Sequence, residues 1–286
     1  MLEIDAEQHF DYESVYFDTP DSASYFLAAH PRRRRFKART RSYLNSGDCY
    51  LEVKTKGSRG TTAKQRLPYS FDERNQLTAA GREYIGELLN DASVAGIDTE
   101  TMAPVLTTRY TRTTLFLPGS GSRCTIDSGL EWQRNDVGLD SAAELGGAAE
   151  LRFDDTVIVE TKSAGQASEV DRILWRMGHR PDRISKFATG LAALSPELPH
   201  NRWSRVLRRH FLRRFWPSQL VRPSPSSSRE SNRSSGEGDP SRSCGAGARC
   251  HHEGVALPHG HSHSWPHWPL SIRNRSWHMA AGCRLG

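Results

Sequence analysis

Hydrophobic and polar residues alternate along much of the first 200 positions. Six runs are rich in β-branched and aromatic residues and are bounded by Gly, Pro, Asn or Asp, as strands usually are. These runs are residues 14–20, 35–43, 49–56, 107–117, 123–132 and 156–162. Helical spacing of apolar residues occurs instead in residues 72–89, 168–178 and 185–194. Strands dominate and few helices are available for parallel crossovers, so the pattern predicts an α+β fold with a mainly antiparallel sheet.

The C-terminal part of the chain lacks both periodicities. From residue 217 onward, Ser, Gly and Pro supply 29 of 70 residues, and 7 of the 12 histidines lie there. This composition is typical of disorder, because it offers little apolar surface for a core. His and Trp clusters without Cys or carboxylates at fixed spacing are weak evidence for a metal site. We therefore expect residues 217–286 to be a disordered tail.

Charge is distributed unevenly. The formal net charge is +6, yet residues 1–201 contain 25 basic and 29 acidic side chains. The mean hydropathy is −0.66 and no apolar run approaches the roughly 20 residues of a membrane-spanning helix, which excludes a transmembrane protein. The acidic N-terminus lacks the basic and apolar regions of a secretory signal, and the five cysteines do not resemble a disulfide framework. A cytoplasmic location fits these features best.

Charged residues gather on one face of several predicted strands, because side chains two apart in a strand point the same way. The residues concerned are Lys37, Arg39, Arg41, Glu52, Lys54, Lys56, Arg123, Asp127, Glu160 and Lys162, with Lys64 and Arg112 on neighbouring segments. For any single strand, a solvated outer face explains the pattern. Repetition over five strands favours one polyanion site, since Arg donates bidentately to phosphate and Lys supplies a mobile charge. The interleaved carboxylates suit a hard divalent cation that is shared with phosphate oxygens.

In this order, the segments resemble the VTC-type polyphosphate polymerase domain of the triphosphate tunnel metalloenzyme (CYTH-like) superfamily. The matching motifs are SVYFDTPD (14–21), KARTRSY (37–43), CYLEVKTK (49–56), TAKQR (62–66), RYTRTTL (109–115), RCTIDSGLEW (123–132), VIVETKS (157–163) and RPDRISKFATG (180–190). The resemblance covers about residues 2–203. It implies an antiparallel, barrel-like triphosphate tunnel with flanking helices and a polar interior. Because the chain begins just before the SVYFDT strand, it also implies an N-terminally truncated domain that lacks one strand and one helix.

The resemblance further implies roles for individual residues. Glu160 would be the ligand of a divalent metal, Mn²⁺ or Mg²⁺. The catalytic set would be Arg39, Arg41, Lys54, Arg112, Arg123 and Glu160. The phosphate-binding set would be Arg39, Arg41, Lys54, Lys64, Arg112, Arg123, Arg183 and Lys186. The implied ligands are ATP and polyphosphate, and the implied reaction transfers the γ-phosphoryl group of a nucleoside triphosphate to a polyphosphate chain.

Other functions remain open at this point. A triphosphatase of the same superfamily would use water as the acceptor and release phosphate. A binding module would hold polyphosphate without turnover. A nucleic-acid binder is the third alternative, supported by the arginines in 32–41 and 202–214, but the body is net acidic and has no recognisable reader motif. We therefore expect no specific nucleic-acid partner.

The sequence thus divides into a tunnel domain (1–200), a basic segment (201–216) and the tail (217–286). In the basic segment, large side chains recur at helical spacing with arginines between them, at Trp203, Val206, Leu207, His210, Phe211 and Phe215. This pattern fits an amphipathic helix on a membrane surface or a protein partner. The preferred interpretation is a C-terminal helix that packs on the barrel with its arginines in solvent.

Overall fold

The computed structural model describes residues 7–56, 62–135, 149–163, 166–211 and 275–282. By its internal contacts the chain divides into one unit of residues 1–217 with 273–286 and a second unit, 218–272, which lies outside the described residues. The strands are β1 (His9–Asp18), β2 (Arg35–Tyr43), β3 (Asp48–Lys56), β4 (Thr62–Pro68), β5 (Ala103–Leu117), β6 (Ser122–Arg134), β7 (Glu150–Phe153), β8 (Thr156–Ser163) and β9 (Arg275–Gly282). The helices are α1 (Ala23–Ala29), α2 (Ala79–Asp91), α4 (Glu169–Arg176), α5 (Lys186–Leu194), the short α6 (Ser204–Val206), a 3₁₀ turn η1 (Asn201–Trp203) and a π-helical turn η2 (Leu207–Phe211).

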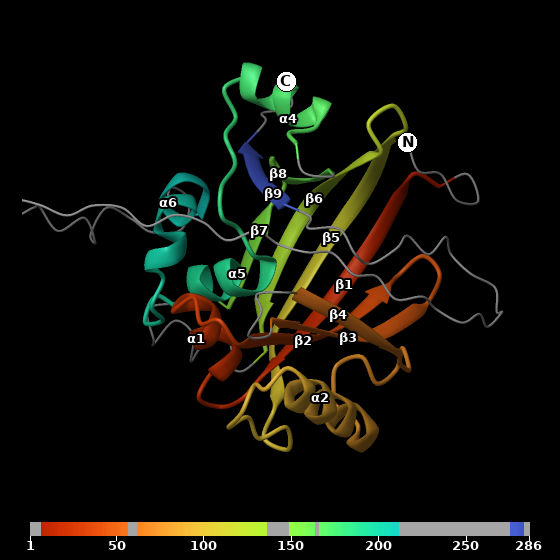
Figure 1. Cartoon of the computed structure of the whole chain (residues 1–286), viewed down its shortest axis with the longest axis vertical. Helices are drawn as coiled ribbons and strands as arrows, with labels where there is room; N and C mark the ends of the chain where they lie inside the picture. The colour runs from red at the N-terminus through yellow and green to blue at the C-terminus, as the bar shows by residue number, and fades with distance from the viewer. Residues whose placement is uncertain (1–6, 57–61, 136–148, 164–165, 212–274, 283–286) are drawn as a thin grey trace, which may run out of the picture. The chain divides into compact units, whose positions relative to one another are not determined.

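One antiparallel sheet organises the fold (Figure 1). Its strand order is β4-β3-β2-β1-β5-β6-β8-β9, and β7 pairs with β6. In Figure 1, β2, β3 and β4 run across the view while β1, β5 and β6 run obliquely to them, so the sheet is strongly twisted. No pairing joins β4 to β9 in the described part of the chain, so the sheet is open there. The predicted α+β antiparallel class is confirmed, and the barrel-like expectation becomes an open, curved sheet.

Local sequence accounts for the main turns and helix starts. The tight β2–β3 connection uses Gly47 at a φ of +74°, a conformation that Gly adopts without strain. Helix α2 begins after Thr78, whose hydroxyl accepts a hydrogen bond from the Gly81 N–H at 3.1 Å. A capping box of Ser168 and Asp171 starts α4. No helix in these described ranges is both long and apolar enough to cross a membrane.

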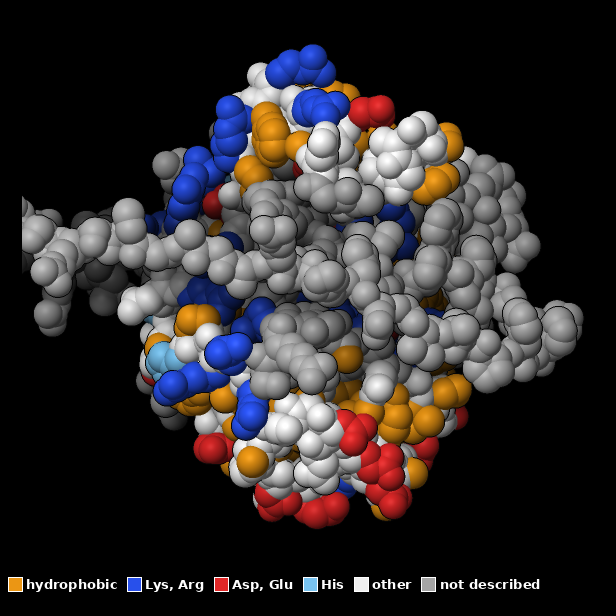
Figure 2. All heavy atoms as spheres, in the orientation of Figure 1, with side chains coloured by type: hydrophobic (Ala, Val, Ile, Leu, Met, Phe, Trp, Pro, Cys, Tyr) orange, Lys and Arg blue, Asp and Glu red, His pale blue; other side chains and the backbone are white. Residues whose placement is uncertain are grey.

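The two faces of the sheet are covered differently. On one face, Val15, Phe36, Leu51 and other apolar strand residues pack beneath α2, with Ile85 and Leu89 fully buried. Figure 2 shows a group of acidic side chains at the end of the molecule that carries this helix. The opposite face carries the charged residues, and α5 packs over only part of it. This face is called the polar face below and is defined by Lys37, Arg39, Arg41, Glu52, Lys54, Lys64, Arg112 and Asp127.

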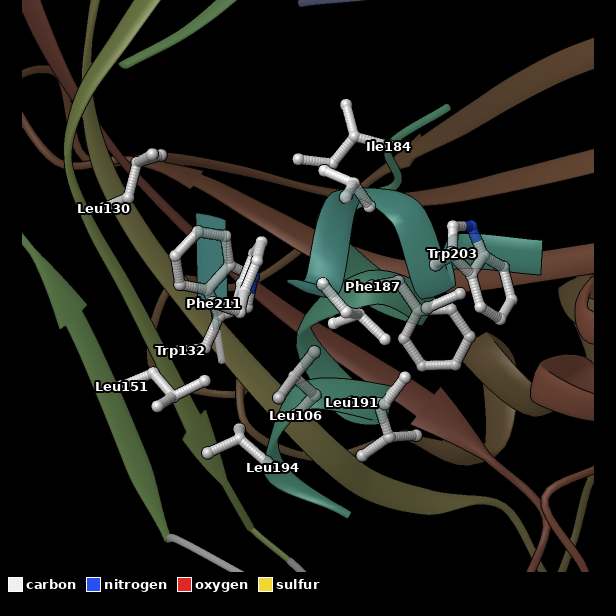
Figure 3. Packing of buried hydrophobic residues seen from close by; sticks show 14 of the residues in the cluster. Leu106, Leu130, Trp132, Leu151, Ile184, Phe187, Leu191, Leu194, Trp203 and Phe211 are labelled. Carbon is white, nitrogen blue, oxygen red and sulfur yellow. The ribbon is translucent and has the colours of Figure 1, made fainter. Parts of the chain in front are cut away.

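Helix α5 fills one end of the polar face with a hydrophobic core. Phe187 and Leu191 of the helix pack against Leu106 of β5 and Trp132 of β6 (Figure 3). Gly190 permits this contact, because a Cβ added there would overlap the Trp132 indole. The indole Nε1–H donates to the Lys186 carbonyl at 2.8 Å, which fixes the first turn of α5 against the sheet. The core therefore positions the residues at the start of α5 beside the charged part of the same face.

The basic segment packs on this core as far as the structure describes it. Trp203, Val206, Leu207 and Phe211 are buried, whereas Arg205 and Arg209 remain largely exposed. The sequence left open a helix on a membrane surface or partner and a helix packed on the barrel. The structure shows packing on the sheet over residues 201–211, as three short turns in place of one regular helix. Residues 212–216 lie outside the described ranges. Within the segment expected to be a disordered tail, residues 275–282 form β9 on the edge of β8.

Candidate functional site

Cross-strand pairing brings the predicted cations together. On β2 and β3, Lys37 lies opposite Lys54, Arg39 opposite Glu52 and Arg41 opposite Tyr50. Lys64 of β4 continues the row beyond Lys54. Directly opposed residues of an antiparallel pair share a face, so these side chains converge as the alternation predicted.

Glu52 is the centre of the first charged cluster. It is 1% exposed and is held by Arg39, whose Nη2 lies 2.6 Å from Oε2, and by Lys64 at the other oxygen. Arg39 also donates to the Tyr16 hydroxyl at 3.0 Å. Burial alone would raise the pKa of the Glu52 carboxyl, but Arg39, Arg41 and Lys64 outweigh burial and hold that pKa far below its usual range. Glu52 is therefore a fixed anion that orients two cations.

Asp127 is the centre of the second cluster. Its fully buried carboxylate accepts two hydrogen bonds from Arg112, at 2.6 and 2.8 Å, and also pairs with Lys186 from α5. Arg41 donates to the hydroxyl of Tyr110 at 3.0 Å, and the Lys186 ammonium lies 4.4 Å from the centre of that ring. Burial would raise the pKa of Tyr110, but Arg41, Arg112 and Lys186 lower it overall. The lowered pKa of the Tyr110 hydroxyl indicates that it lies in a strongly positive electrostatic field.

Glu160 and Arg123 lie further along the same face. Glu160 is opposite Thr125 and Arg123 is opposite Lys162, two and four residues from Asp127 along β6. The Glu160 carboxylate pairs with Lys162 at 3.0 Å. Burial lowers the pKa of Arg112, while Tyr110, Asp127 and Glu160 together raise it well above its usual value, so Glu160 acts electrostatically on the second cluster. Arg123 is exposed at the outer margin of this group.

A cavity of about 660 Å³ lies where β2 begins and β3 ends. Its lining includes Lys37, Lys54 and Arg183, together with Ser185, which caps α5. Lys37 donates to the Ser185 hydroxyl at 2.9 Å. Removal from bulk water, followed by repulsion from Arg39, Arg35 and Lys186, lowers the pKa of Lys37 to about 7. Lys54, although exposed to the cavity, has its pKa lowered to about 6 by desolvation and then by Arg39, Lys37 and Arg41.

The carboxylates of the polar face are the candidate donors for a divalent metal. The described residues contain no group of three or more His, Cys, Asp or Glu side chains that could hold an ion. Glu52 and Asp127 each pair with two cations, and Glu160, at the margin of the face, pairs with Lys162. Mg²⁺ commonly binds through one or two carboxylates, substrate phosphates and water, without a cage of protein ligands. The residues therefore fit a metal that binds together with a phosphate ligand.

Most of the sequence-predicted site residues lie on one face, in three groups. Arg39 and Lys64 belong to the Glu52 cluster, Arg112 and Lys186 to the Asp127 cluster, and Arg123 with Glu160 to the margin. Arg41 donates to Tyr110 and also lowers the pKa of Glu52, so it acts on both clusters. Lys54 and Arg183 line the cavity. Sequence reasoning missed Tyr16 and Tyr110 as partners of the arginines. The alternation of side chains along β5 could have indicated Tyr110, which lies two residues from Arg112 and so shares its face. Tyr16 lies directly opposite Arg39 in the β1–β2 pair.

A comparison with known protein families identifies the family of this chain. The VTC domain family matches residues 1–195. Because this match spans more than half of the sequence, the chain belongs to the VTC domain family. Membership supports an enzyme of the triphosphate tunnel type, a type that generally uses divalent metals. A search of curated proteins finds no match.

Several solved structures are similar at low identity. HpAC1 from Hippeastrum, provisionally called an adenylyl cyclase and described as having a dominant triphosphatase activity, is 16% identical with a TM-score of 0.39; the match covers 68% of this chain and 87% of that one. A Bacillus halodurans protein provisionally called an adenylate cyclase is 12% identical with a TM-score of 0.32, covering 59% and 73%. The PH1819 protein of Pyrococcus horikoshii OT3 is 14% identical with a TM-score of 0.32, covering 65% and 85%.

Proposed function

We propose that this protein is a polyphosphate polymerase-like phosphotransferase. Its substrates would be a nucleoside triphosphate, such as ATP, and a polyphosphate chain that accepts the γ-phosphoryl group. The observation that carries the proposal is the gathering of cations from strands β2, β3, β4 and β5 and from α5 on one face of the sheet. Such an array matches a ligand that carries negative charge along its whole length.

The reaction needs little covalent chemistry from the protein. A terminal oxygen of the polyphosphate chain attacks the γ-phosphorus, the bond from that phosphorus to the β–γ bridging oxygen breaks, and the nucleoside diphosphate leaves with the electron pair. Charge accumulates on the transferred and bridging oxygens during this step, so catalysis rests on positioned cations. We assign this role to Arg39, Arg41, Lys54, Arg112 and Arg123, with Lys64, Arg183 and Lys186 binding further phosphates.

The buried carboxylates support this role by fixing the cations before a ligand arrives. Arg39 is oriented by Glu52 and Arg112 by Asp127, each through two hydrogen bonds. A cation held in place in this way loses little conformational freedom on binding phosphate. Each arginine keeps N–H groups beyond those used by its carboxylate, and these are the groups available to phosphate oxygens.

We assign the divalent metal to Glu160. A bound Mg²⁺ or Mn²⁺ would neutralise phosphate charge there and help to orient the transferred group. Lys162, 3.0 Å from the Glu160 carboxylate, keeps that side chain in place beside the Asp127 cluster. The proposal therefore predicts turnover that depends on both the metal and the Glu160 charge.

The test is identification of the product. Purified protein is incubated with ATP labelled on the γ-phosphate and Mg²⁺ or Mn²⁺, with EDTA as the control, and products are separated by gel electrophoresis and assayed for free phosphate. Label in a polymer, lost in EDTA, is the expected result. Label in free phosphate alone would replace the polymerase with a triphosphatase. Label that remains in ATP under every condition would refute both the polymerase and the triphosphatase.

A further inference from the structure

The cations around the cavity differ from those in the two clusters. Arg39, Lys64, Arg112 and Lys186 each pair with a buried carboxylate. The six basic residues that line the cavity form no salt bridge to any residue that the structure describes. They are Arg35, Lys37, Lys54, Lys56, Arg183 and Arg202. An unneutralised group of this size repels itself, and a bound anion would relieve that repulsion.

The pKa values show this repulsion at separate points. The pKa of Arg202 is lowered by burial and then by the charges of Arg35 and Arg183. The pKa of Lys37 falls to about 7 through burial and repulsion from Arg39 and Arg35. Arg202 lies on η1 and Lys37 on β2, so the repulsion acts on cations from two different elements around the cavity.

Three of these six side chains are held in position around this space. Arg202 donates to the Ala28 carbonyl at 2.7 Å, which fastens η1 to α1. Lys37 is fixed by the Ser185 hydroxyl, as described above, and Arg35 donates to the Arg32 carbonyl at 2.8 Å. Asp182 is the one carboxylate in the lining within the described ranges, and Arg205 and Arg209 lie 3.5 and 3.4 Å from it. Its negative charge is therefore already matched by these two cations, neither of which lines the cavity.

We propose that this cavity is a second anion subsite, formed by Arg35, Lys37, Lys56 and Arg202, that holds the phosphate units of a linear polyphosphate beyond those bound at the Glu52 and Asp127 clusters. The identity of the ligand rests on the proposed function. Lys54 lies between the two regions, because it lines the cavity and opposes both Lys37 and Lys64. A chain that occupies the clusters can thus continue into the cavity along a row of cations. We expect a triphosphate to be held at the Glu52 and Asp127 clusters without these additional contacts.

The test compares binding of a short and a long ligand. The double variant Arg35→Gln with Lys56→Gln removes two cavity charges, and Arg32→Gln with Arg34→Gln removes two exposed charges from the neighbouring turn, outside the lining. Tripolyphosphate and a several-fold longer linear polyphosphate are titrated into each protein without metal, and thermal unfolding verifies the fold. We expect the cavity variant to bind the long chain about tenfold more weakly, because each charged hydrogen bond contributes on the order of 1.5 kcal/mol or more. Its affinity for tripolyphosphate should match the wild type, and the control variant should bind both ligands normally.

Two results would overturn the subsite. One is wild-type affinity of the cavity variant for the long chain. The other is an equal loss for both ligands, which would make the cavity part of the triphosphate site or part of a general field. The proposed function is judged separately, because the titration involves no turnover. A wild-type protein that binds the long chain through the cavity but forms no polymer refutes the polymerase and leaves the subsite standing. A wild-type protein that forms polymer but binds the long chain no more tightly than tripolyphosphate refutes the subsite and leaves the polymerase standing.

Discussion

Arg39 donates from Nε and Nη2 to a single oxygen of Glu52, at 3.0 and 2.6 Å, and the two residues face each other across β2 and β3. The other Glu52 oxygen pairs with Lys64 from β4. One buried carboxylate therefore ties three strands together and aims two cations at the same face. The carboxylate stabilises the sheet edge and orients the cations, but its negative charge itself repels an anion. Loss of the charge with the shape retained should therefore lower stability without weakening anion binding.

Replacing Glu52 with Gln should separate the two roles. Gln keeps the shape but leaves Arg39 without its counter-charge, so we expect the free energy of unfolding to fall by about 3 kcal/mol. Removing a negative charge from the polar face should leave tripolyphosphate binding equal to or tighter than that of the wild type. Urea denaturation and calorimetric titration measure the two quantities. Glu83→Gln, an exposed site on α2, is the matched control; an unchanged stability of Glu52→Gln would contradict the structural role.

The contact between α5 and the sheet gives a second prediction. Gly190→Ala should destabilise the protein by about 2 kcal/mol, because the new methyl group overlaps the Trp132 indole and forces the core to shift. Gly86→Ala on α2 is the control, since a methyl group added there would lie 3.9 Å from its nearest neighbour and helix propensity favours Ala at that position. Thermal unfolding of both variants checks this. Equal stability of the two would show that α5 does not pack as closely on β6 as described.

The lysines at the cavity predict a pH dependence of binding. The pKa of Lys37 is about 7 and that of Lys54 about 6 in the free protein, so both lose charge as the pH rises through this range. A bound long-chain polyphosphate favours the charged form, so the contribution of these lysines to its affinity should be greatest below about pH 6 and fall as the pH rises through 6 and 7, with proton uptake on binding. Arg39, Arg35, Arg41 and Lys186 repel these ammonium groups, while the Glu52 charge favours the charged form of Lys54.

Comparison of Lys37→Gln with the wild type separates the contribution of Lys37 to the pH dependence of binding from that of the ligand. Titration of the phosphate ligand itself is the same for both proteins and cancels in the comparison. Calorimetric titrations at several pH values, in buffers of different ionisation enthalpy, report proton uptake directly. We expect the variant to show a shallower pH profile and smaller uptake than the wild type; identical profiles would mean that Lys37 does not titrate on binding.

Glu160→Gln tests the assignment of the metal. We expect loss of metal-dependent turnover with little change in unfolding, because Glu160 is half-buried and Gln preserves its shape. Tripolyphosphate binding in EDTA should be retained, which separates a metal role from a general phosphate role. Glu150→Gln, at an exposed position of β7, removes the same charge as a control. Turnover of Glu160→Gln at the wild-type rate would contradict the assignment.

Alternation along single strands was sufficient to predict much of the polar face. It placed Lys37, Arg39 and Arg41 together and set Glu52 and Lys54 beside them, and the cross-strand registers confirm this. The signal is strong because the opposite face of the same strands is apolar and buried under α2. Register follows from that burial, since a shift by one residue would turn the charges into the core.

Features that depend on tertiary contacts were not predicted. Helix α1 has no side-chain cap at Ser22; instead the carboxylate of Asp18 accepts hydrogen bonds from the Ser24 and Tyr25 N–H groups. Strand β4 is exposed along most of its length and shows little hydrophobic alternation. The position of α5 over one end of the polar face, and with it the pairing of Lys186 with Asp127, follows from packing against Trp132. Spacing in the sequence carries no information on such long-range contacts.

The central claim is that the polar face of the sheet binds inorganic polyphosphates, and titration with tripolyphosphate tests it most directly. Arg41→Gln removes one cation from this face, and Arg176→Gln removes the same charge from an exposed position on α4. Binding should weaken steeply for every protein between about 50 and 200 mM salt. At fixed salt we predict about tenfold weaker binding for Arg41→Gln and no change for Arg176→Gln. Equal affinities of Arg41→Gln, Arg176→Gln and the wild type would contradict the claim and place the anion site elsewhere.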